Sequence, residues 1–180
     1  KAIVTAINRA IRSLSRARKF PRRAIYEIVI AGNSSMRDLV FGLDIQSIGQ
    51  KPYKSLTEHE YLAGKRASTE IICDAWELGF RANRKTRLYG LPLIGSHVGG
   101  DAAACLTAIG MATVKDEVVM VVDVGTNTEV VIGNATRMLA ASCPAGPAFE
   151  GGLVKYGMPG YEGAIETIKY CTGSGTFEYS

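Results

Sequence analysis

The stretch VVMVVDVGTNTEVVIG, residues 118–133, decides how the rest of the chain is interpreted. Its branched apolar residues predict a buried strand with one carboxylate, Asp123, at its end. Gly125, Thr126 and Asn127 then predict a turn into a second strand. The N–H groups of a Gly-rich turn form an anion-binding concavity, and a neighbouring carboxylate can hold Mg²⁺. We therefore predict a phosphate and metal site, with an ordinary β-hairpin whose Asp caps the turn as the alternative.

Two glycine-containing corners precede this hairpin. Residues 24–31 predict a strand buried on both faces, followed by Gly32-Asn33-Ser34-Ser35 and a helix with apolar positions Met36, Leu39, Val40 and Leu43. Later, Gly99-Gly100-Asp101 precedes a helix over residues 102–111. Each helix start is predicted to face a ligand, or else Asn33 and Asp101 only cap their helices. We interpret the adjacent His97 as a structural rather than a catalytic histidine.

The remaining pattern predicts an α/β protein. Residues 2–15 have helical spacing, and residues 44–63 suggest a long surface excursion. Trp76 and Phe80 are four residues apart, which favours a packed helix face within residues 66–80. Pro92 makes residues 88–94 a short or edge strand. Very short turns predict an antiparallel meander of three strands, residues 118–123, 129–132 and 137–142.

The composition excludes several classes of protein. Hydrophobic residues make up 47% of the 180 residues and charged residues 21%, which argues against disorder and coiled coil. No signal peptide or apolar run of membrane-spanning length is present, so we expect no membrane partner. The four cysteines are widely spaced, which argues against a zinc or iron–sulfur motif in this chain and fits a cytoplasmic protein. Because the chain begins with Lys1, we expect it to be part of a longer protein.

Positive charge is concentrated after the first predicted helix. Five cations lie between residues 16 and 23, namely Arg16, Arg18, Lys19, Arg22 and Arg23. Such a run can meet a nucleic acid or an acidic partner. Because no nucleic-acid motif accompanies it, we interpret it as a solvated helix end and expect no nucleic-acid partner.

Four segments in order resemble the reductive activators of corrinoid proteins, including O-demethylase activating enzymes. The segments are IAGNSSMRDLVFGLD with KPY behind it, LPLIGSHVGGDAAA, VVDVGTNTEVVIGN and CPAGPAFEGGLVKYGM. These activators belong to the actin-like ATPase superfamily, which also contains sugar kinases, acetate kinase and heat-shock chaperones. The resemblance implies an α/β, ribonuclease-H-like actin/ATPase fold, of which this chain is a part. Residues 1–114 would complete the first subdomain with its connecting helix, and residues 115–180 would begin the second.

The resemblance also implies site residues and a function. Asp123 and Asp101 would be the catalytic carboxylates and would hold Mg²⁺ directly or through water. Gly125, Thr126 and Asn127 would bind phosphate; Gly146, Glu150 and Gly151 would approach the nucleoside; Gly100 and Asn33 would line the nucleotide site. The protein would use ATP to drive reduction of Co(II) to Co(I) in a partner corrinoid protein. The iron–sulfur cluster, the first phosphate hairpin and the adenosine motif of the family would lie outside these residues. The alternatives are a small-molecule kinase of the same superfamily and a non-catalytic docking module.

Overall fold

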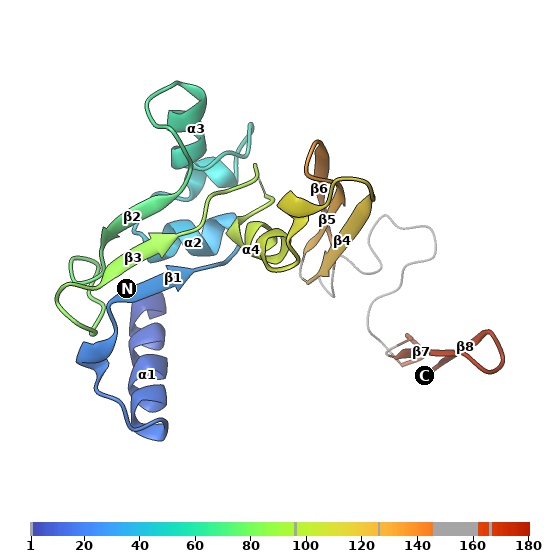
Figure 1. Cartoon of the computed structure of the whole chain (residues 1–180), viewed down its shortest axis with the longest axis horizontal. Coiled ribbons are helices and arrows are strands. Elements are labelled where there is room, and N and C mark those ends of the chain that lie inside the picture. Colours follow the sequence, from blue (N-terminus) through green and yellow to red (C-terminus); the bar gives the residue numbers. More distant parts are fainter. Residues whose placement is uncertain (1, 96, 126, 146–161, 166) are drawn as a thin grey trace.

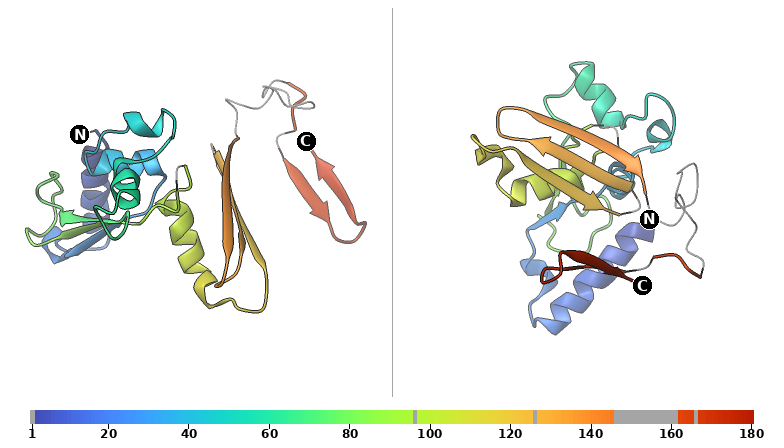
Figure 2. Two further views of the ribbon diagram at one scale, coloured as in Figure 1. Left: turned by 90° about the horizontal axis from the view of Figure 1, so that it is seen from above. Right: turned by 90° about the vertical axis from the view of Figure 1, so that its right-hand side faces the viewer.

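Three separate β-sheets follow one another along the chain (Figures 1 and 2). The structure is a computed structural model, and it describes residues 2–95, 97–125, 127–145, 162–165 and 167–180. Its elements are α1 (Ala2–Ala17), η1 (Arg22–Ala24), β1 (Glu27–Ile30), α2 (Ser34–Val40), η2 (Gln46–Ile48), α3 (Leu56–Leu62), β2 (Ile71–Asp74), β3 (Arg87–Gly90), α4 (Gly100–Ala108), η3 (Met111–Thr113), β4 (Val119–Val124), β5 (Asn127–Gly133), β6 (Met138–Pro144), β7 (Ile168–Cys171) and β8 (Thr176–Tyr179).

The first sheet has the order β1-β3-β2 and carries the main hydrophobic core. β3 pairs in parallel with β1 and antiparallel with β2. Leu88 of β3 is completely buried and clusters with Val4 of α1 and Val40 of α2. Phe41, at the end of α2, packs on Gly90, where a Cβ would lie 2.5 Å from the phenyl ring. This contact requires glycine at the end of β3.

The described residues cover only one face of this sheet. Val29 of β1 is 54% exposed and Ile72 of β2 is 51% exposed, whereas Ile28 and Ile30 pack against the core. The expectation that residues 24–31 form a strand buried on both faces is therefore wrong. The sequence of β1 is apolar at successive positions, so it did not show the alternation of buried and exposed side chains. That alternation arises because α1 and α2 contribute to the core on one side of the sheet.

Three other local expectations for the N-terminal part are wrong in whole or in part. Residues 71–74 form β2 and residues after it form turns, so Trp76 and Phe80 do not share a helix. β3 is short, as one of the two alternatives predicted, but it is central in its sheet rather than at an edge, because it ends at Gly90, two residues before Pro92. The segment 44–63 contains α3 with buried Thr57 and Glu58, and is more than a surface excursion.

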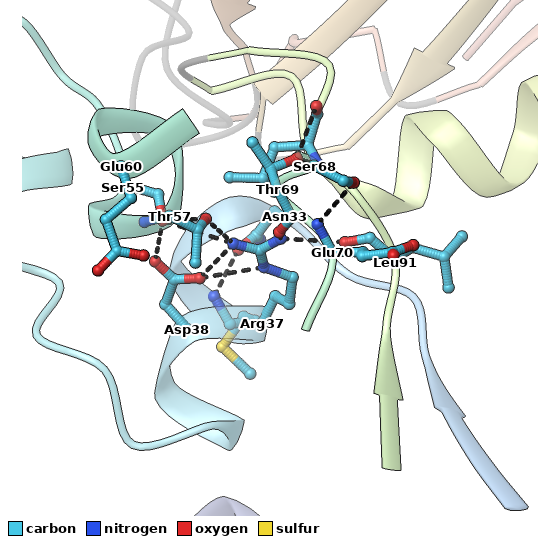
Figure 3. A network of polar contacts seen from close by, with 12 residues as sticks. Asn33, Arg37, Asp38, Ser55, Thr57, Glu60, Ser68, Thr69, Glu70 and Leu91 are labelled. Carbon is cyan, nitrogen blue, oxygen red and sulfur yellow. Dashed lines mark hydrogen bonds and ion pairs between the residues drawn. The ribbon is translucent and has the colours of Figure 1, made fainter. Parts of the chain in front are cut away.

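A buried ion pair joins α2 to three other segments (Figure 3). Arg37 and Asp38 both have 0% exposed side chains, and their closest N···O distance is 2.8 Å. The Arg37 guanidinium also donates to the Thr69 carbonyl at 2.8 Å, to the Leu91 carbonyl at 3.0 Å and to the Thr57 hydroxyl at 2.7 Å. The Ser55 hydroxyl donates to Asp38 Oδ2 at 2.6 Å. Charge and hydrogen bonds are thus matched inside this network.

The second sheet is the antiparallel meander β4-β5-β6, as predicted. β4 and β5 come closer to their connecting turn than predicted, so that only residues 125 and 126 separate them. β7 and β8 form a separate two-stranded sheet in the C-terminal residues. None of the helices in the described ranges combines the length and apolar character that crossing a bilayer requires.

Candidate functional site

The start of α4 lies directly against the end of β1, and we call this place the α2–α4 corner (Gly32, Asn33, Gly99, Gly100 and Asp101). The Asp101 N–H donates to the Gly32 carbonyl at 3.2 Å. A Cβ on Gly99 would lie 2.7 Å from Asn33 Cα and 2.8 Å from the Ser34 nitrogen. The two glycine corners that were separate in the sequence therefore form one site.

Both polar side chains of this corner are engaged in local hydrogen bonds. Asn33 Oδ1 accepts from the Met36 N–H at 2.9 Å, so Asn33 caps α2. Asp101 Oδ1 accepts from the Ala102 N–H at 2.9 Å, within the first turn of α4. The predicted capping role is confirmed for Asn33, whereas Asp101 lies inside the first turn of α4 and Gly99 is the N-cap, without a side-chain hydrogen bond. The second carboxylate oxygen of Asp101 has no hydrogen bond among the described residues, which leaves it able to bind a ligand or water.

The second site is the hairpin corner, formed by Asp123, Gly125, Asn127, Glu129 and Ser142. Asp123 of β4 is directly opposite Glu129 of β5, and Glu129 is opposite Ser142 of β6. Residues opposite one another in this way share one face of the sheet. The Ser142 hydroxyl donates to Glu129 Oε1 at 3.0 Å. The side chain of Asp123 is half-buried, and no ion pair or hydrogen bond to it is found in the described part of the chain.

One backbone N–H group of the hairpin turn, that of Gly125, is not free to bind phosphate as predicted. The Gly125 N–H donates to the Asn127 carbonyl at 3.0 Å. That N–H is therefore occupied within the turn, and Gly125 does not offer a free donor in this conformation. Thr126, the third predicted phosphate ligand, lies outside the described residues.

The donors at the two corners are of the type that Mg²⁺ prefers. Asp123, Glu129 and Asp101 supply hard carboxylate oxygens, and Mg²⁺ usually takes one or two protein carboxylates and completes its octahedron with water and phosphate. No group of three or more His, Cys, Asp or Glu side chains suited to a metal ion occurs among the described residues. The residues thus fit a Mg²⁺ ion that arrives with a nucleotide rather than a closed protein cage.

Sequence reasoning missed two residues at these sites and one beside them. Glu129 was taken as an ordinary strand residue because the turn was predicted to be longer, which hid its pairing with Asp123. Ser142 belongs to the site because the register of β6 places it opposite Glu129. Arg37 was overlooked because the helix was expected to bury Met36 and Leu39, both of which are exposed.

The other predicted residues are His97 and the three nucleoside contacts. His97 is exposed, and its ring lies 5.7 Å from that of Tyr53, so the contact found for it is aromatic. Gly146, Glu150 and Gly151, the predicted nucleoside contacts, lie outside the described residues.

Two family profiles together match almost the whole chain. The "RACo middle region" matches residues 1–114, and the "C-terminal domain of RACo the ASKHA domain" matches residues 117–180. The chain belongs to the RACo family. The resemblance to corrinoid-protein activators is thereby confirmed, and so is the actin-like ATPase fold class, since ASKHA denotes that fold.

Individual RACo relatives agree with this assignment. A solved structure of a reductive activator for corrinoid, iron-sulfur protein superposes with a TM-score of 0.71 and 32% identity, covering 99% of this chain and 27% of that one. The corrinoid activation enzyme RamQ of Eubacterium limosum is 29% identical over 98% of this chain and 28% of its own length. The [Co(II) methylated amine-specific corrinoid protein] reductase of Methanosarcina barkeri is 36% identical over 43% of this chain and 14% of its own length. This RACo chain therefore spans less than a third of the length of these relatives.

Proposed function

We propose that this chain is part of an enzyme that binds and hydrolyses ATP to drive reduction of Co(II) to Co(I) in a corrinoid protein. Membership of the RACo family supports the proposal most strongly, because both relatives with curated names act on corrinoid proteins. We further propose that residues 1–114 complete a first ribonuclease-H-like subdomain and residues 115–180 begin a second. A cytoplasmic location fits the four cysteines, all of which are free thiols.

The carboxylate of Asp123, which has no partner among the described residues, would be the main protein ligand of the cation. Glu129 faces it across the hairpin and is held by Ser142, so a second oxygen is available at a fixed position. Mg²⁺, when bound with ATP, would neutralise phosphate charge and order the phosphates for attack by water. Asp101, at the start of α4, would accept a hydrogen bond from that water and orient it. Such catalysis depends on positioning and electrostatics, which carboxylates and backbone N–H groups can supply.

The substrate side of the site would be completed by the other predicted residues. Asn33 and Gly100 would line the nucleotide pocket at the α2–α4 corner, while Asn127 and Thr126 would contact phosphate. Gly146, Glu150 and Gly151 would approach the nucleoside. The iron–sulfur cluster that supplies the electron would belong to a domain outside this chain, so these residues couple ATP to the transfer without carrying the electron.

Asp123→Asn in the full-length protein tests the proposal. The substitution keeps the size of the side chain but removes its charge, so ATP hydrolysis and ATP-dependent Co(II) reduction are both expected to fall roughly a hundred-fold. Co(I) formation can be followed by the absorption spectrum of the corrinoid. Asp116→Asn, in the exposed turn before β4, is the matched control and should leave both rates unchanged. Undiminished reduction by Asp123→Asn would refute the role of this carboxylate.

A further inference from the structure

The N-terminal part of the chain carries a basic surface that the proposed nucleotide site does not use. We define it by Arg9 and Arg12 of α1, Arg22 and Arg23 of η1, and Arg81 and Arg84 of the connection between β2 and β3. Two hollows lie along it. One of about 350 Å³ is lined by Arg22, Arg23, Trp76 and Arg81, and one of about 380 Å³ by Arg9, Arg12 and Arg81. Because both hollows include Arg81, the surface is continuous.

Hydrogen bonds hold the three contributing segments together. The Asn8 side chain donates to the Gly79 carbonyl at 2.9 Å and accepts from the Arg81 N–H at 2.8 Å, which joins α1 to the β2–β3 connection. Asn83 Nδ2 donates to the Arg23 carbonyl at 2.6 Å, which joins the same connection to η1. These hydrogen bonds hold the backbone segments that carry the arginines in place, although α1 and the β2–β3 connection are more than 70 residues apart in the sequence.

The charge of this surface is not neutralised by the residues that the structure describes. Residues 2–24 contain seven cations and no Asp or Glu. The β2–β3 connection, residues 75–86, adds three cations against a single acid, Glu77. Within the described ranges, none of the six arginines of the basic surface forms an ion pair, and the nearby Asp74 is bound by Arg87 at 3.1 Å. Such an uncompensated patch attracts anionic partners over several ångströms of solvent.

Trp76 gives the patch a fixed shape and limits what can bind there. The guanidinium carbons of Arg81 and Arg84 lie 5.0 and 5.5 Å from the centre of its ring, which is the geometry of cation–π contacts. Single-stranded nucleic acids are usually bound by stacking bases on free aromatic faces, and here arginines lie over the ring. A membrane-binding basic helix needs a free apolar side, but Val4, Ile7 and Ile11 of α1 belong to the core cluster.

We propose that the basic surface docks an acidic face of a protein, and, on the basis of the proposed function, that this protein is the corrinoid protein. A partly exposed Trp with arginines around it resembles the centre of a protein–protein interface, where Trp and Arg are enriched. The positive field would raise the association rate of an acidic partner and select against basic ones. ATP hydrolysis would proceed elsewhere, at the hairpin and α2–α4 corners.

Charge reversal in the full-length protein tests this docking surface. Arg22→Glu combined with Arg81→Glu should weaken corrinoid-protein binding roughly ten-fold to a hundred-fold at low salt, mainly through a slower association rate. The wild-type affinity should itself fall as NaCl rises from about 0.05 M to about 0.3 M. Arg9→Glu combined with Arg12→Glu, on the exposed side of α1, should also lower the affinity for the corrinoid protein. This second variant keeps the test valid if the first one misfolds. Lys65→Glu combined with Lys115→Glu makes the same charge change at two exposed positions outside the basic surface and should leave the affinity unchanged.

Two readouts separate this inference from the proposed function. If the wild-type protein reduces its corrinoid partner and hydrolyses ATP, the charge-reversed variants should keep ATP hydrolysis without the partner and lose reduction at limiting partner concentration. Equal affinity of the wild type and both variants for the corrinoid protein would overturn the docking surface alone. The docking surface would then be overturned even if these arginines contact another part of the chain or bind nucleic acid. A wild-type protein without corrinoid reduction would overturn both proposals together.

Discussion

Arg37 connects α2 to the segments that flank the first sheet. All three of its guanidinium nitrogens donate inside the protein, and its partner Asp38 is equally buried. Removing one member of a buried pair leaves the other as an uncompensated charge, which costs about 3–5 kcal/mol. Arg37→Ala should therefore lower the free energy of unfolding by about that amount, as measured by urea denaturation.

Arg87→Ala provides the comparison. Arg87 pairs with Asp74 at 3.1 Å, but the two side chains are 56% and 48% exposed. Solvent screens such a pair, so the loss should be about 1 kcal/mol or less. If the two substitutions cost the same, the Arg37 network is not the stabilising element described here.

The reactivity of the thiols should also differ by residue. Burial raises the pKa of the Cys73 thiol, and the negative charge of Glu77 raises it further, whereas Cys143 is exposed on β6. A raised pKa keeps the thiol protonated to higher pH, and only the thiolate reacts with iodoacetamide. At about pH 8, close to the usual thiol pKa, we expect Cys143 to be alkylated first and Cys73 to react appreciably only as the pH rises further. Mass spectrometry of the labelled peptides measures this order, and faster labelling of Cys73 would contradict it.

The burial of α2 shows where residue patterns mislead. Met36 and Leu39 are apolar and exposed, whereas Ser34, Arg37 and Asp38 are polar and buried. These three buried positions, together with Phe41, have the i, i+3, i+4, i+7 spacing of one helix face. The helical periodicity was therefore predicted correctly, but several of the buried positions are polar. Arg37 and Asp38 can be buried because they pair with each other and with groups 17 to 54 residues away, which a local pattern does not indicate.

At the scale of elements, the contact between α4 and the end of β1 is unusually close. The Cβ of an Ala at position 99 would fall within 3 Å of two backbone atoms, Asn33 Cα and the Ser34 nitrogen. Backbone cannot move aside as a flexible side chain can, so Gly99→Ala should destabilise the protein by about 1–3 kcal/mol. If the α2–α4 corner binds nucleotide, the same substitution should also weaken the thermal shift produced by Mg-ATP.

Gly173→Ala is the matched control for this change. A Cβ at position 173 would meet nothing within 4 Å, so both stability and the Mg-ATP shift should stay close to wild type. Unchanged stability of Gly99→Ala would mean that α4 can withdraw from the corner without cost.

The elements that were predicted correctly are the local ones. The meander β4-β5-β6 follows from consecutive strands and short turns, which set the register between neighbours. The first sheet could not be derived in this way, because β1 pairs with β3, about 60 residues later. Its register also places Asp74 opposite Arg87, a pairing that no local pattern indicates. For the same reason, the hairpin corner was only half predicted: the motif indicated Asp123, and the tertiary register added Glu129 and Ser142.

At the scale of the whole molecule, the proposed activities are spatially divided. The basic surface lies on α1, η1 and the β2–β3 connection, whereas the hairpin corner lies on the second sheet, beyond α4 (Figure 1). α4 links the two parts, since its first residues contact the end of β1 and the chain after it enters β4. Under the proposed function, α4 would be the element through which the state of the nucleotide reaches the docked partner.

The Arg37 network has a consequence for how the N-terminal part folds. Its guanidinium is satisfied only when α2, Thr57, Thr69 and Leu91 have all reached their places. An intermediate that buries the guanidinium without one of these partners would leave a donor unfilled, which is a state of high free energy. The network therefore favours simultaneous assembly of α2 with the segments that carry Thr57, Thr69 and Leu91, and we expect these segments to lose their protection from hydrogen exchange together.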